Sequence, residues 1–338
     1  MSVIKEKIKV GIIGASGYTG LELIKILINH PRFEFNYIAN TEGSMSIDNI
    51  HPSLVDVCDM NVQKADVNDV AFSCELVFLA LPHKTAMAYV KPLIELGVKV
   101  VDLSADYRLP LKTYELFYTQ HTDEKNLNLA VYGLPELNAK KLKGASLVSN
   151  PGCFPTSAIL GLLPFMQMRI KNSPIIIDAK TGVSGAGKKL SEVTHFVNVN
   201  DNTFAYNPLS HRHAPEIADK LGVDFDEINF VPHLLPLTRG MISSIYIQVD
   251  GNFNEEELLR EYYKNSRFVR VFSNPVTMKD TAGTNFCDIY VKRKGNILFI
   301  SSAIDNLMRG ASSQAVVNAN LMMGFDEDLG IPNVAYVP

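Results

Sequence analysis

The sequence predicts a two-domain α/β protein: a Rossmann-like, doubly wound parallel sheet, followed by an α+β domain whose sheet is mixed and largely antiparallel. The chain has 338 residues, which is more than one typical domain. Its first half alternates buried strand patterns with helical patterns, as in a parallel sheet covered on both faces. After about residue 150, strand patterns follow one another with few helices between them, which is typical of an α+β domain.

The hydrophobic pattern places the elements of both halves. In the first half it predicts strands at 9–13, 35–39, 75–81 and 98–103, and helices at 21–28 and about 85–96. In the second half it predicts strands at 175–177, 229–231, 241–249, 268–272, 288–291 and 296–301. We assign residues 1–150 to the first domain and 151–305 to the second. The segment at about 306–338, with a helix at about 310–323, is expected to complete the first domain.

The composition limits the class of protein. Apolar residues make up 46% of the chain and charged residues 20%, as in a globular protein with a large core. A net charge of −4 gives no reason to expect a nucleic acid or an anionic membrane as partner. The longest apolar stretches are too short to span a bilayer, and the charged start has no signal-peptide core. Four cysteines without a CxxC pair then favour free thiols in the cytoplasm.

A glycine-rich turn separates the first predicted strand from the first predicted helix. Glycine lets backbone N–H groups approach a phosphate, and the helix N-terminus adds partial positive charge. Because this is the first βα turn of an alternating chain, it predicts a dinucleotide site. The expected contacts are Gly14, Ser16, Gly17, Tyr18, Thr19 and Gly20.

The residues after the second predicted strand normally read the adenine ribose. Here they include Thr41 and Glu42. A carboxylate suits a free ribose hydroxyl, whereas a 2′-phosphate prefers a cation. Glu42 is equally explained as a solvated loop charge, so these residues leave NAD and NADP both open.

Cys153 is the best candidate for a nucleophile. It follows Asn150-Pro151-Gly152 and precedes an apolar helix predicted at 157–163. At a helix N-terminus the dipole favours the thiolate, and nearby backbone N–H groups can bind an oxyanion. The other cysteines, at 58, 74 and 287, are interpreted as small buried apolar residues.

A thiolate needs a partner that handles protons. His211, Arg212 and His213 lie together just before a predicted helix. Either histidine could serve, and Arg212 could bind an anion. Two histidines at i and i+2 could also suggest a metal, but no third ligand of fitting spacing is evident, so no metal is expected.

Two further segments are suited to anions. Residues 180–189 are glycine-rich, hydroxylated and basic, and they include Ser184, Gly185 and Lys188. Residues 102–108 follow a predicted strand of the first domain, where ligands bind in such sheets, and include Ser104 and Arg108. A flexible loop and a surface ion pair are the structural alternatives.

Together these motifs resemble the N-acetyl-gamma-glutamyl-phosphate reductase family of the semialdehyde dehydrogenase group. The resemblance runs nearly end to end, through GASGYTGLEL, LALPHK, DLSADYRL, YGLPEL, NPGCFPT, TGVSGAGKK, HRHAPEI, HLLPLTRGM and DNLMRGASSQAV. It implies a cytoplasmic NADP enzyme of arginine biosynthesis that forms homodimers or homotetramers. Two departures stand out: Thr41-Glu42 replaces a frequent Ser-Arg, and RGASSQA replaces KGAAGQA.

The resemblance also implies roles for residues. Cys153 would attack the acyl phosphate, phosphate would leave, and hydride from NADPH would reduce the thioester to the semialdehyde. His213 would donate a proton to the departing oxygen. Cofactor contacts would further include Thr41, Pro82, Ser184, Gly185 and Asn306, and substrate contacts Ser104, Arg108, Asn150, Lys188, His211 and Arg212.

Three other functions remain open from the residues. A sister reductase acting on an N-succinyl-glutamyl, aspartyl or aminoadipyl phosphate would use the same cysteine chemistry. A cysteine hydrolase would need Cys and His but no dinucleotide loop. A non-catalytic dinucleotide sensor would need no reactive thiol.

Overall fold

The computed structural model describes residues 7–336, which form two compact units. The first unit contains the described residues up to Pro151 together with Ala311–Ile331. The second contains Gly152–Gly310 and the described residues from Pro332 onward. Within residues 7–336, no helix combines the length and apolar character needed to cross a bilayer.

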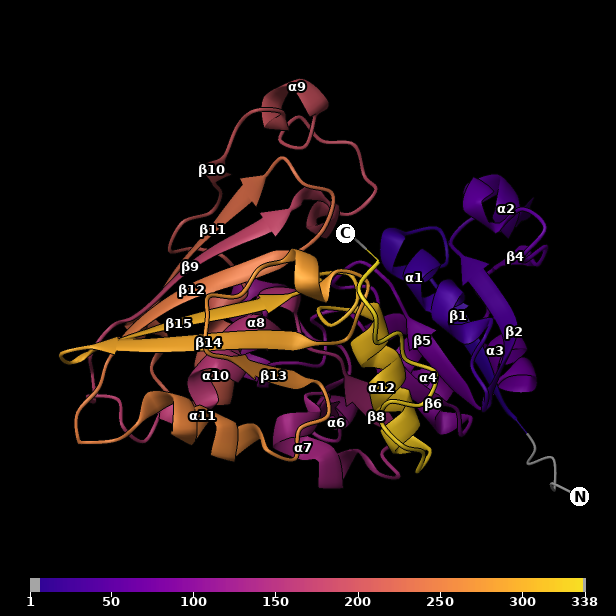
Figure 1. The fold of residues 1–338 in the computed structure, drawn as a ribbon. Helices are drawn as coiled ribbons and strands as arrows, with labels where there is room; N and C mark the ends of the chain where they lie inside the picture. Colours follow the sequence, from indigo (N-terminus) through magenta and orange to yellow (C-terminus); the bar gives the residue numbers. More distant parts are fainter. Residues whose placement is uncertain (1–6, 337–338) are drawn as a thin grey trace, which may run out of the picture. The chain divides into compact units, whose positions relative to one another are not determined.

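The first unit is built on a sheet that is parallel except at one edge (Figure 1). Its strands lie in the order β3 (Met45–Ser46), β4 (Asn61–Lys64), β2 (Phe33–Asn40), β1 (Ile8–Ile13), β5 (Leu76–Leu79), β6 (Lys99–Asp102), β8 (Leu147–Ser149) and β7 (Val131–Tyr132). The pair β3 and β4 is antiparallel, and every other neighbouring pair is parallel. The predicted doubly wound sheet is therefore confirmed.

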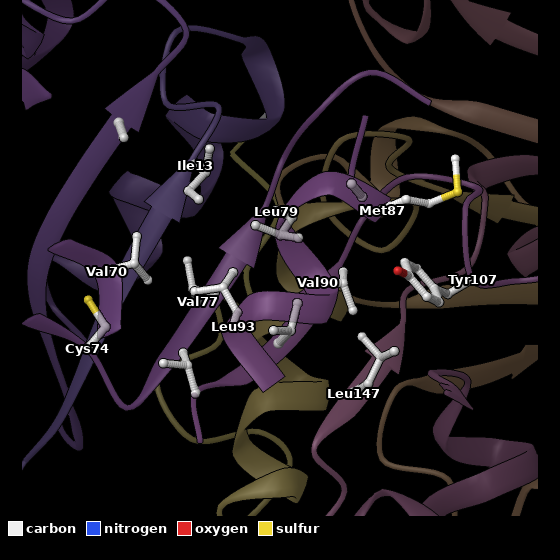
Figure 2. Packing of buried hydrophobic residues seen from close by; sticks show 14 of the residues in the cluster. Ile13, Val70, Cys74, Val77, Leu79, Met87, Val90, Leu93, Tyr107 and Leu147 are labelled. Carbon is white, nitrogen blue, oxygen red and sulfur yellow. The ribbon is translucent and has the colours of Figure 1, made fainter. Parts of the chain in front are cut away.

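Helices lie beside this sheet and bury its apolar side chains. They are α1 (Tyr18–Leu27), α2 (Ile47–Ile50), α3 (Val67–Ser73), α4 (Met87–Glu95), α5 (Leu111–Phe117), α6 (Glu124–Leu127), α7 (Pro135–Leu142) and α12 (Ser312–Met322), with a 3₁₀ turn at Pro52–Leu54. Figure 2 shows Val77 and Leu79 of β5 packing with Val90 and Leu93 of α4. The alternation of apolar strands and amphipathic helices in the sequence is thus the pattern of one buried core.

The C-terminal helix α12 is integrated into the first unit. Ten of its eleven residues are buried, and it packs against α1, α7 and β6. The Ser312 hydroxyl donates to the Thr19 carbonyl over 2.9 Å, and Asn318 Nδ2 donates to the Gly133 carbonyl over 2.8 Å. Helix α12, although far away in the chain, therefore packs beside α1, which follows the glycine-rich turn.

The hydrophobic pattern of the sequence does not predict several of the short strands. The segment 98–103 was expected to be the last strand of the first unit, but β7 and β8 follow it and lie beyond it in the sheet. Each has only two or three residues, too few to show a hydrophobic period. Strand β8 matters for the site because it ends at Ser149, directly before Asn150.

The second unit contains a mixed, largely antiparallel sheet, as predicted. Its order is β10 (Phe204–Ala205), β11 (Ile228–Leu235), β9 (Ile175–Gly182), β12 (Met241–Gln248), β15 (Ile297–Ile304), β14 (Cys287–Lys294) and β13 (Val269–Phe272). Among the described strands of this second sheet, only β11 with β9 and β13 with β14 pair in parallel. Strands β9 and β11 run several residues past their predicted ends because polar residues alternate there with buried ones.

Three helices pack on one face of this sheet. Helix α8 (Cys153–Leu162) lies on β12 and β15, α10 (Ala214–Leu221) on β11, and α11 (Glu255–Tyr263) on β13 and β14. Outside this layer lie α9 (Phe196–Val199) and four 3₁₀ turns, at Leu163–Phe165, Val183–Ala186, Phe225–Glu227 and Lys279–Thr281. The helices bury alternate residues of each strand, whereas the intervening residues, such as Ile176 and Tyr246, are about 40% exposed.

Candidate active site

Cys153 is the first residue of helix α8, as the sequence predicted. Gly152 caps the helix with an extended backbone (φ −68°, ψ 155°), and the chain turns into the helix at Cys153. The side chain is half-buried, so a reagent or substrate can still reach it. Its place at the N-terminus of a ten-residue helix favours the thiolate.

Helix α8 is anchored so that the position of Cys153 is well defined. All nine of its residues after Cys153 are buried. One turn into the helix, Ser157 Oγ lies within hydrogen-bonding distance of Ser243 Oγ of β12 and of the Ser302 carbonyl of β15, at 2.9 and 3.0 Å. These bonds satisfy polar groups that would be costly to bury alone, and they prevent the helix from sliding on the sheet.

A buried carboxylate joins the nucleophile loop to the histidine helix. The Gly152 N–H donates to Glu216 Oε1 over 2.9 Å, and Glu216 is 1% exposed. Glu216 lies in the first turn of α10, for which His213 is the N-cap residue. A hydrogen bond to a carboxylate is among the stronger ones, so it links the start of α8 firmly to the first turn of α10.

Aromatic rings gather beside the nucleophile. The Phe154 ring lies 5.8 Å from the His211 ring and 5.9 Å from the His213 ring, centroid to centroid. The two histidine rings are 4.8 Å apart, and Tyr206 lies 5.6 Å from His211. The structure therefore brings the predicted histidines to the residue that follows Cys153.

The two histidines lie in different electrostatic environments. Burial, and secondly the charge of Arg212, lower the pKa of His211 to about 4. Its Nδ1 accepts the His213 backbone N–H over 3.1 Å. His211 is therefore neutral at physiological pH, which favours His213 as the group that handles protons.

Tyr206 completes this cluster. Burial raises the pKa of its hydroxyl, and the neighbouring charge of Cys153 raises it further. The phenol therefore remains protonated beside the nucleophile and can donate a hydrogen bond. No pattern in the sequence marked this tyrosine.

Gly310 lies against the nucleophile from a distant part of the chain. A Cβ atom at this position would stand 2.6 Å from Cys153 Cβ and 2.5 Å from the Asn306 carbonyl oxygen. Only glycine permits this approach. Gly310 lies within the RGASSQA string, and the sequence predicted no role for it.

The loop after β9 is joined to the turn after β15. Asn306 Nδ2 donates to Ser184 Oγ over 3.0 Å, and its Oδ1 accepts the Gly240 N–H over 2.8 Å. Ser184 and Asn306, both predicted cofactor contacts, therefore lie together, whereas Gly185 and Lys188 are exposed. Arg212 is also exposed.

The glycine-rich turn of the first unit has the conformation that its sequence requires. Gly14 has φ +103°, and a side chain there would collide with the Ala80 carbonyl. A side chain at Gly20 would collide with the backbone of Gly14 and Ala15. Ser16 Oγ accepts the Asn40 amide over 2.8 Å, so the end of β2 is tied to the turn. Such a turn at a helix N-terminus is suited to a pyrophosphate.

Of the remaining predicted contact residues of the first unit, some are exposed and others are buried. Thr41, Glu42 and Pro82 are exposed near the ends of β2 and β5, and Tyr18 and Thr19 open α1. Ser104, Arg108 and Asn150 are buried and bonded within the unit. Arg108 donates to the carbonyls of Asn150 and Leu103, each over 2.7 Å, and Asn150 Oδ1 accepts from Asn318. In this arrangement Arg108 and Asn150 shape the chain before Cys153.

The prediction that the other three cysteines are buried holds for Cys74 and Cys287, but it is wrong for Cys58, which is half-buried. Burial raises the pKa of Cys74 to about 12, and Cys287 Sγ lies 3.3 Å from Ser302 Oγ in the core. Within residues 7–336, no three His, Cys, Asp or Glu side chains are gathered so as to hold a metal ion.

Comparison with known proteins identifies the class. The family model described as the semialdehyde dehydrogenase NAD binding domain matches residues 9–145, and the semialdehyde dehydrogenase dimerisation domain matches residues 153–306. Among solved structures, aspartate semialdehyde dehydrogenase II from Vibrio cholerae has a TM-score of 0.70 at 14% identity, covering 94% of this chain and 98% of its own. A Candida albicans aspartate semialdehyde dehydrogenase with NADP has a TM-score of 0.66 at 15% identity, covering 94% and 98%. The chain contains both semialdehyde dehydrogenase domains and has the fold of that class.

Sequence relatives narrow the class. Proteins named N-acetyl-gamma-glutamyl-phosphate reductase are 72% identical in Sulfurimonas denitrificans, 58% in a Sulfurovum species and 53% in Wolinella succinogenes. Each comparison covers 98% of this chain and at least 99% of the relative. The chain belongs to the N-acetyl-gamma-glutamyl-phosphate reductase family and is an oxidoreductase.

We expect Gly310→Ala to impair catalysis. The added methyl group would force Cys153 or the Asn306 carbonyl out of place, and displacements of this size cost on the order of 10- to 100-fold in kcat. Steady-state kinetics of the purified variant measure the effect. Gly251→Ala is the control for replacing a glycine without a new contact, because a Cβ atom added there would face open space. Wild-type kcat in Gly310→Ala would show that the contact with Cys153 is not needed.

We expect His211 to destabilise the fold in acid. Its folded pKa, about 4, lies below the ordinary value of 6.5, so unfolding takes up a proton between these pH values. Stability is therefore lost as pH falls from 6.5 to 4, by up to about 3 kcal/mol. On going from about pH 7 to about pH 4.5, the free energy of unfolding of His211→Gln should fall less than that of wild type. The exposed His195→Gln serves as control, and an equal fall in all three proteins would contradict the assignment.

Proposed function

We propose that the protein reduces N-acetyl-gamma-glutamyl phosphate to N-acetylglutamate 5-semialdehyde and phosphate with NADPH, as a cytoplasmic step of arginine biosynthesis. The observation that carries the proposal is Cys153 at the N-terminus of α8, tied through Glu216 to the helix that His213 caps. The names of relatives up to 72% identical over nearly the whole chain supply the substrate.

Cys153 is the nucleophile in the proposed reaction. Its thiolate attacks the acyl carbon of the substrate, the bond to the phosphate oxygen breaks, and phosphate leaves with the electron pair. A thioester on Cys153 remains. The N–H groups of the first turn of α8 face a developing oxyanion, which such donors stabilise.

The second half of the reaction returns the thiolate. The bound nicotinamide cofactor would supply the hydride that reduces the thioester carbon. His213 gives a proton to the oxygen of the resulting tetrahedral adduct and takes it back as the carbonyl reforms. The carbon–sulfur bond then breaks, which releases the aldehyde and restores the Cys153 thiolate. His211, neutral and bonded to the His213 amide, keeps that histidine in place.

We infer that the cofactor is NADP. The glycine turn of the first unit would hold the dinucleotide: Gly14 and Gly20 permit its close packing, and Ser16 Oγ ties it to Asn40. Lys64 would supply the cation for a 2′-phosphate: the parallel register pairs it with Asn40, and the Gly43 backbone packs directly on the Lys64 backbone. It stands at the strand end where a cation would meet the phosphate.

We also propose that the protein assembles as a homodimer or homotetramer through the second unit. The face of its sheet opposite α8, α10 and α11 has no covering layer in the described chain. Tyr246 and Ile176 are 40% and 44% exposed there, and Phe299 packs 5.3 Å from Tyr246. A second copy would cover these side chains, and the matched family model for this unit is described as a dimerisation domain.

The reverse reaction tests the proposed function. With N-acetylglutamate semialdehyde, phosphate and NADP, we expect phosphate-dependent formation of reduced nicotinamide, followed by absorbance. Cys153→Ser should abolish it, because a hydroxyl is a far weaker nucleophile than a thiolate. Cys58→Ser, another half-buried cysteine, is the matched control and should keep full activity.

The alternatives give different results in the same assay. Activity only with N-succinyl or unacylated semialdehydes would replace the substrate and keep the mechanism. Activity that persists in Cys153→Ser would exclude the covalent mechanism.

We expect Lys64 and Glu42 to have opposite effects on cofactor choice. Removing the cation in Lys64→Ala should lower the ratio of kcat/KM for NADP to that for NAD by about tenfold, the effect of one charged contact. Glu42→Ala should raise the ratio, because a carboxylate repels a 2′-phosphate. Kinetics with both cofactors measure the ratio, and Lys91→Ala on α4 is the control. An unchanged ratio in Lys64→Ala would remove this lysine from the cofactor site.

A further inference from the structure

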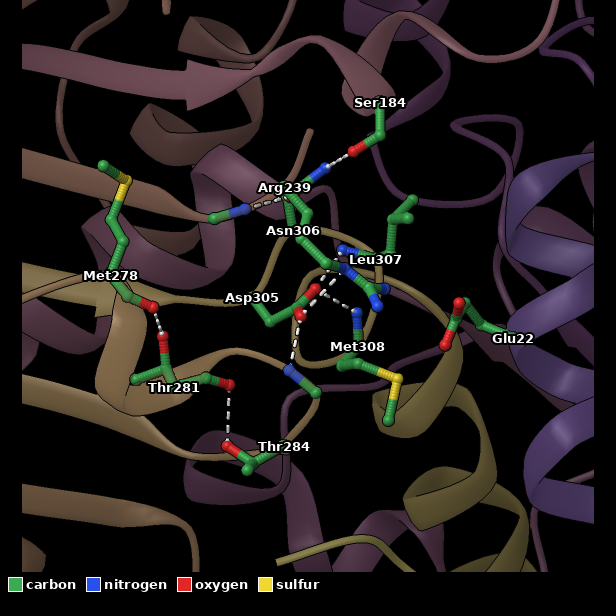
Figure 3. Close-up of polar contacts among 12 residues, drawn as sticks. Glu22, Ser184, Arg239, Met278, Thr281, Thr284, Asp305, Asn306, Leu307 and Met308 are labelled. Carbon is green, nitrogen blue, oxygen red and sulfur yellow. Dashed lines mark hydrogen bonds and ion pairs between the residues drawn. The ribbon is translucent and has the colours of Figure 1, made fainter. Parts of the chain in front are cut away.

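A buried carboxylate outside the proposed catalytic groups lies at the end of strand β15. The Asp305 side chain is completely buried. Figure 3 shows its two oxygens at the centre of a set of polar contacts from three segments of the second unit. Charged groups are rarely buried without a definite arrangement of partners.

One oxygen of Asp305 holds the turn that follows it. Oδ1 accepts the Leu307 N–H over 2.8 Å and the Met308 N–H over 3.1 Å. The Asp305 backbone carbonyl also accepts the Gly310 N–H over 3.0 Å. Three bonds from a single residue therefore determine the course of residues 306–310.

The other oxygen joins this turn to two more segments. Oδ2 accepts the Gly283 N–H over 2.7 Å and lies 3.1 Å from Arg239 Nε. The Arg239 side chain is only 12% exposed, so the ion pair is largely shielded from water. A pair in such surroundings is screened weakly, and removing one partner leaves the other charge buried.

The 306–310 turn carries two groups of the proposed site. Asn306 bonds Ser184 Oγ and the Gly240 N–H, and Gly240 directly follows Arg239. Gly310 packs so closely against Cys153 that a Cβ atom added to the glycine would stand 2.6 Å from Cys153 Cβ. A shift of Asp305 would therefore reach both the nucleophile and the loop after β9.

The C-terminal segment covers this ion pair. The Tyr336 ring packs directly on Gly283, and the Tyr336 N–H donates to the Ala282 carbonyl over 3.3 Å. Arg239 Cζ lies 5.7 Å from the centre of the same ring. Tyr336 thus contacts both residues that meet Asp305 Oδ2.

We propose that Asp305 and Arg239 are positioning residues for catalysis, and that Tyr336 seals their ion pair. The pair sets the 306–310 turn, and the turn sets Cys153 through Gly310 and Ser184 through Asn306. The proposal rests on the proposed function for its effect on turnover, but not for its effect on the Cys153 thiol.

The test compares Asp305→Asn with wild type by two measurements. Asparagine keeps the size and an oxygen for Leu307 and Met308, but it cannot pair with Arg239. We expect kcat to fall by about tenfold or more while KM for the acyl phosphate changes less than about threefold. Alkylation of Cys153 by iodoacetamide, followed by mass spectrometry without substrate, should become about threefold faster or more because a looser turn uncovers the thiol.

Matched variants separate positioning from general destabilisation. Glu227→Gln also breaks a largely buried pair with an arginine, Arg169, but touches no residue of the 306–310 turn. It should leave alkylation and kcat unchanged even if the melting temperature falls. Tyr336→Ala should shift both measurements in the same direction as Asp305→Asn, and it serves in its place if Asp305→Asn does not fold.

The outcomes distinguish this proposal from the proposed function. Alkylation and kcat within about twofold of wild type in both Asp305→Asn and Tyr336→Ala would overturn the positioning role. Faster alkylation in a protein that shows no activity on the acyl phosphate would support the positioning role and refute the proposed substrate.

Discussion

The hydrogen bond from the Gly152 N–H to the Glu216 carboxylate is the constraint on which the candidate site depends. It joins the start of the helix that presents Cys153 to the start of the helix that His213 caps. Both helices rest on one sheet, so neither can turn without disturbing the other. A covalent mechanism needs a thiolate and a proton donor that are held close together. This buried bond links the starts of the two helices that carry Cys153 and His213.

The turn at 306–310, after β15, completes the site. Gly310 limits the space beside Cys153, and Asn306 joins the loop after β9 to the chain after Arg239. Most of these contacts involve a backbone atom, and the bond from Asn306 Nδ2 to Ser184 Oγ joins two side chains. The chemistry of the site is therefore carried by a few side chains, while backbone groups from distant parts of the chain set its dimensions.

Much of this could be predicted from the sequence, because hydrophobic period and helix-end residues act locally. The glycine turn, the placement of Cys153 at a helix start and the mixed second sheet all follow from neighbouring residues. Strands β7 and β8 could not be found, because two or three residues show no period. Glu216, Tyr206 and Gly310 gain their roles from contacts across the fold. Arg108 and Asn150 were predicted as substrate contacts, and both are buried. Asn150 bonds to Asn318 of α12, which lies far away in sequence.

The complete burial of helix α8 behind Cys153 has a consequence for the thiolate. The field of a helix dipole at a protein surface is weakened by dissolved ions, but ions cannot enter the packed layer around residues 154–162. The part of the thiolate's stabilisation that comes from the helix is therefore screened less by dissolved ions than it would be at a helix exposed along its whole length.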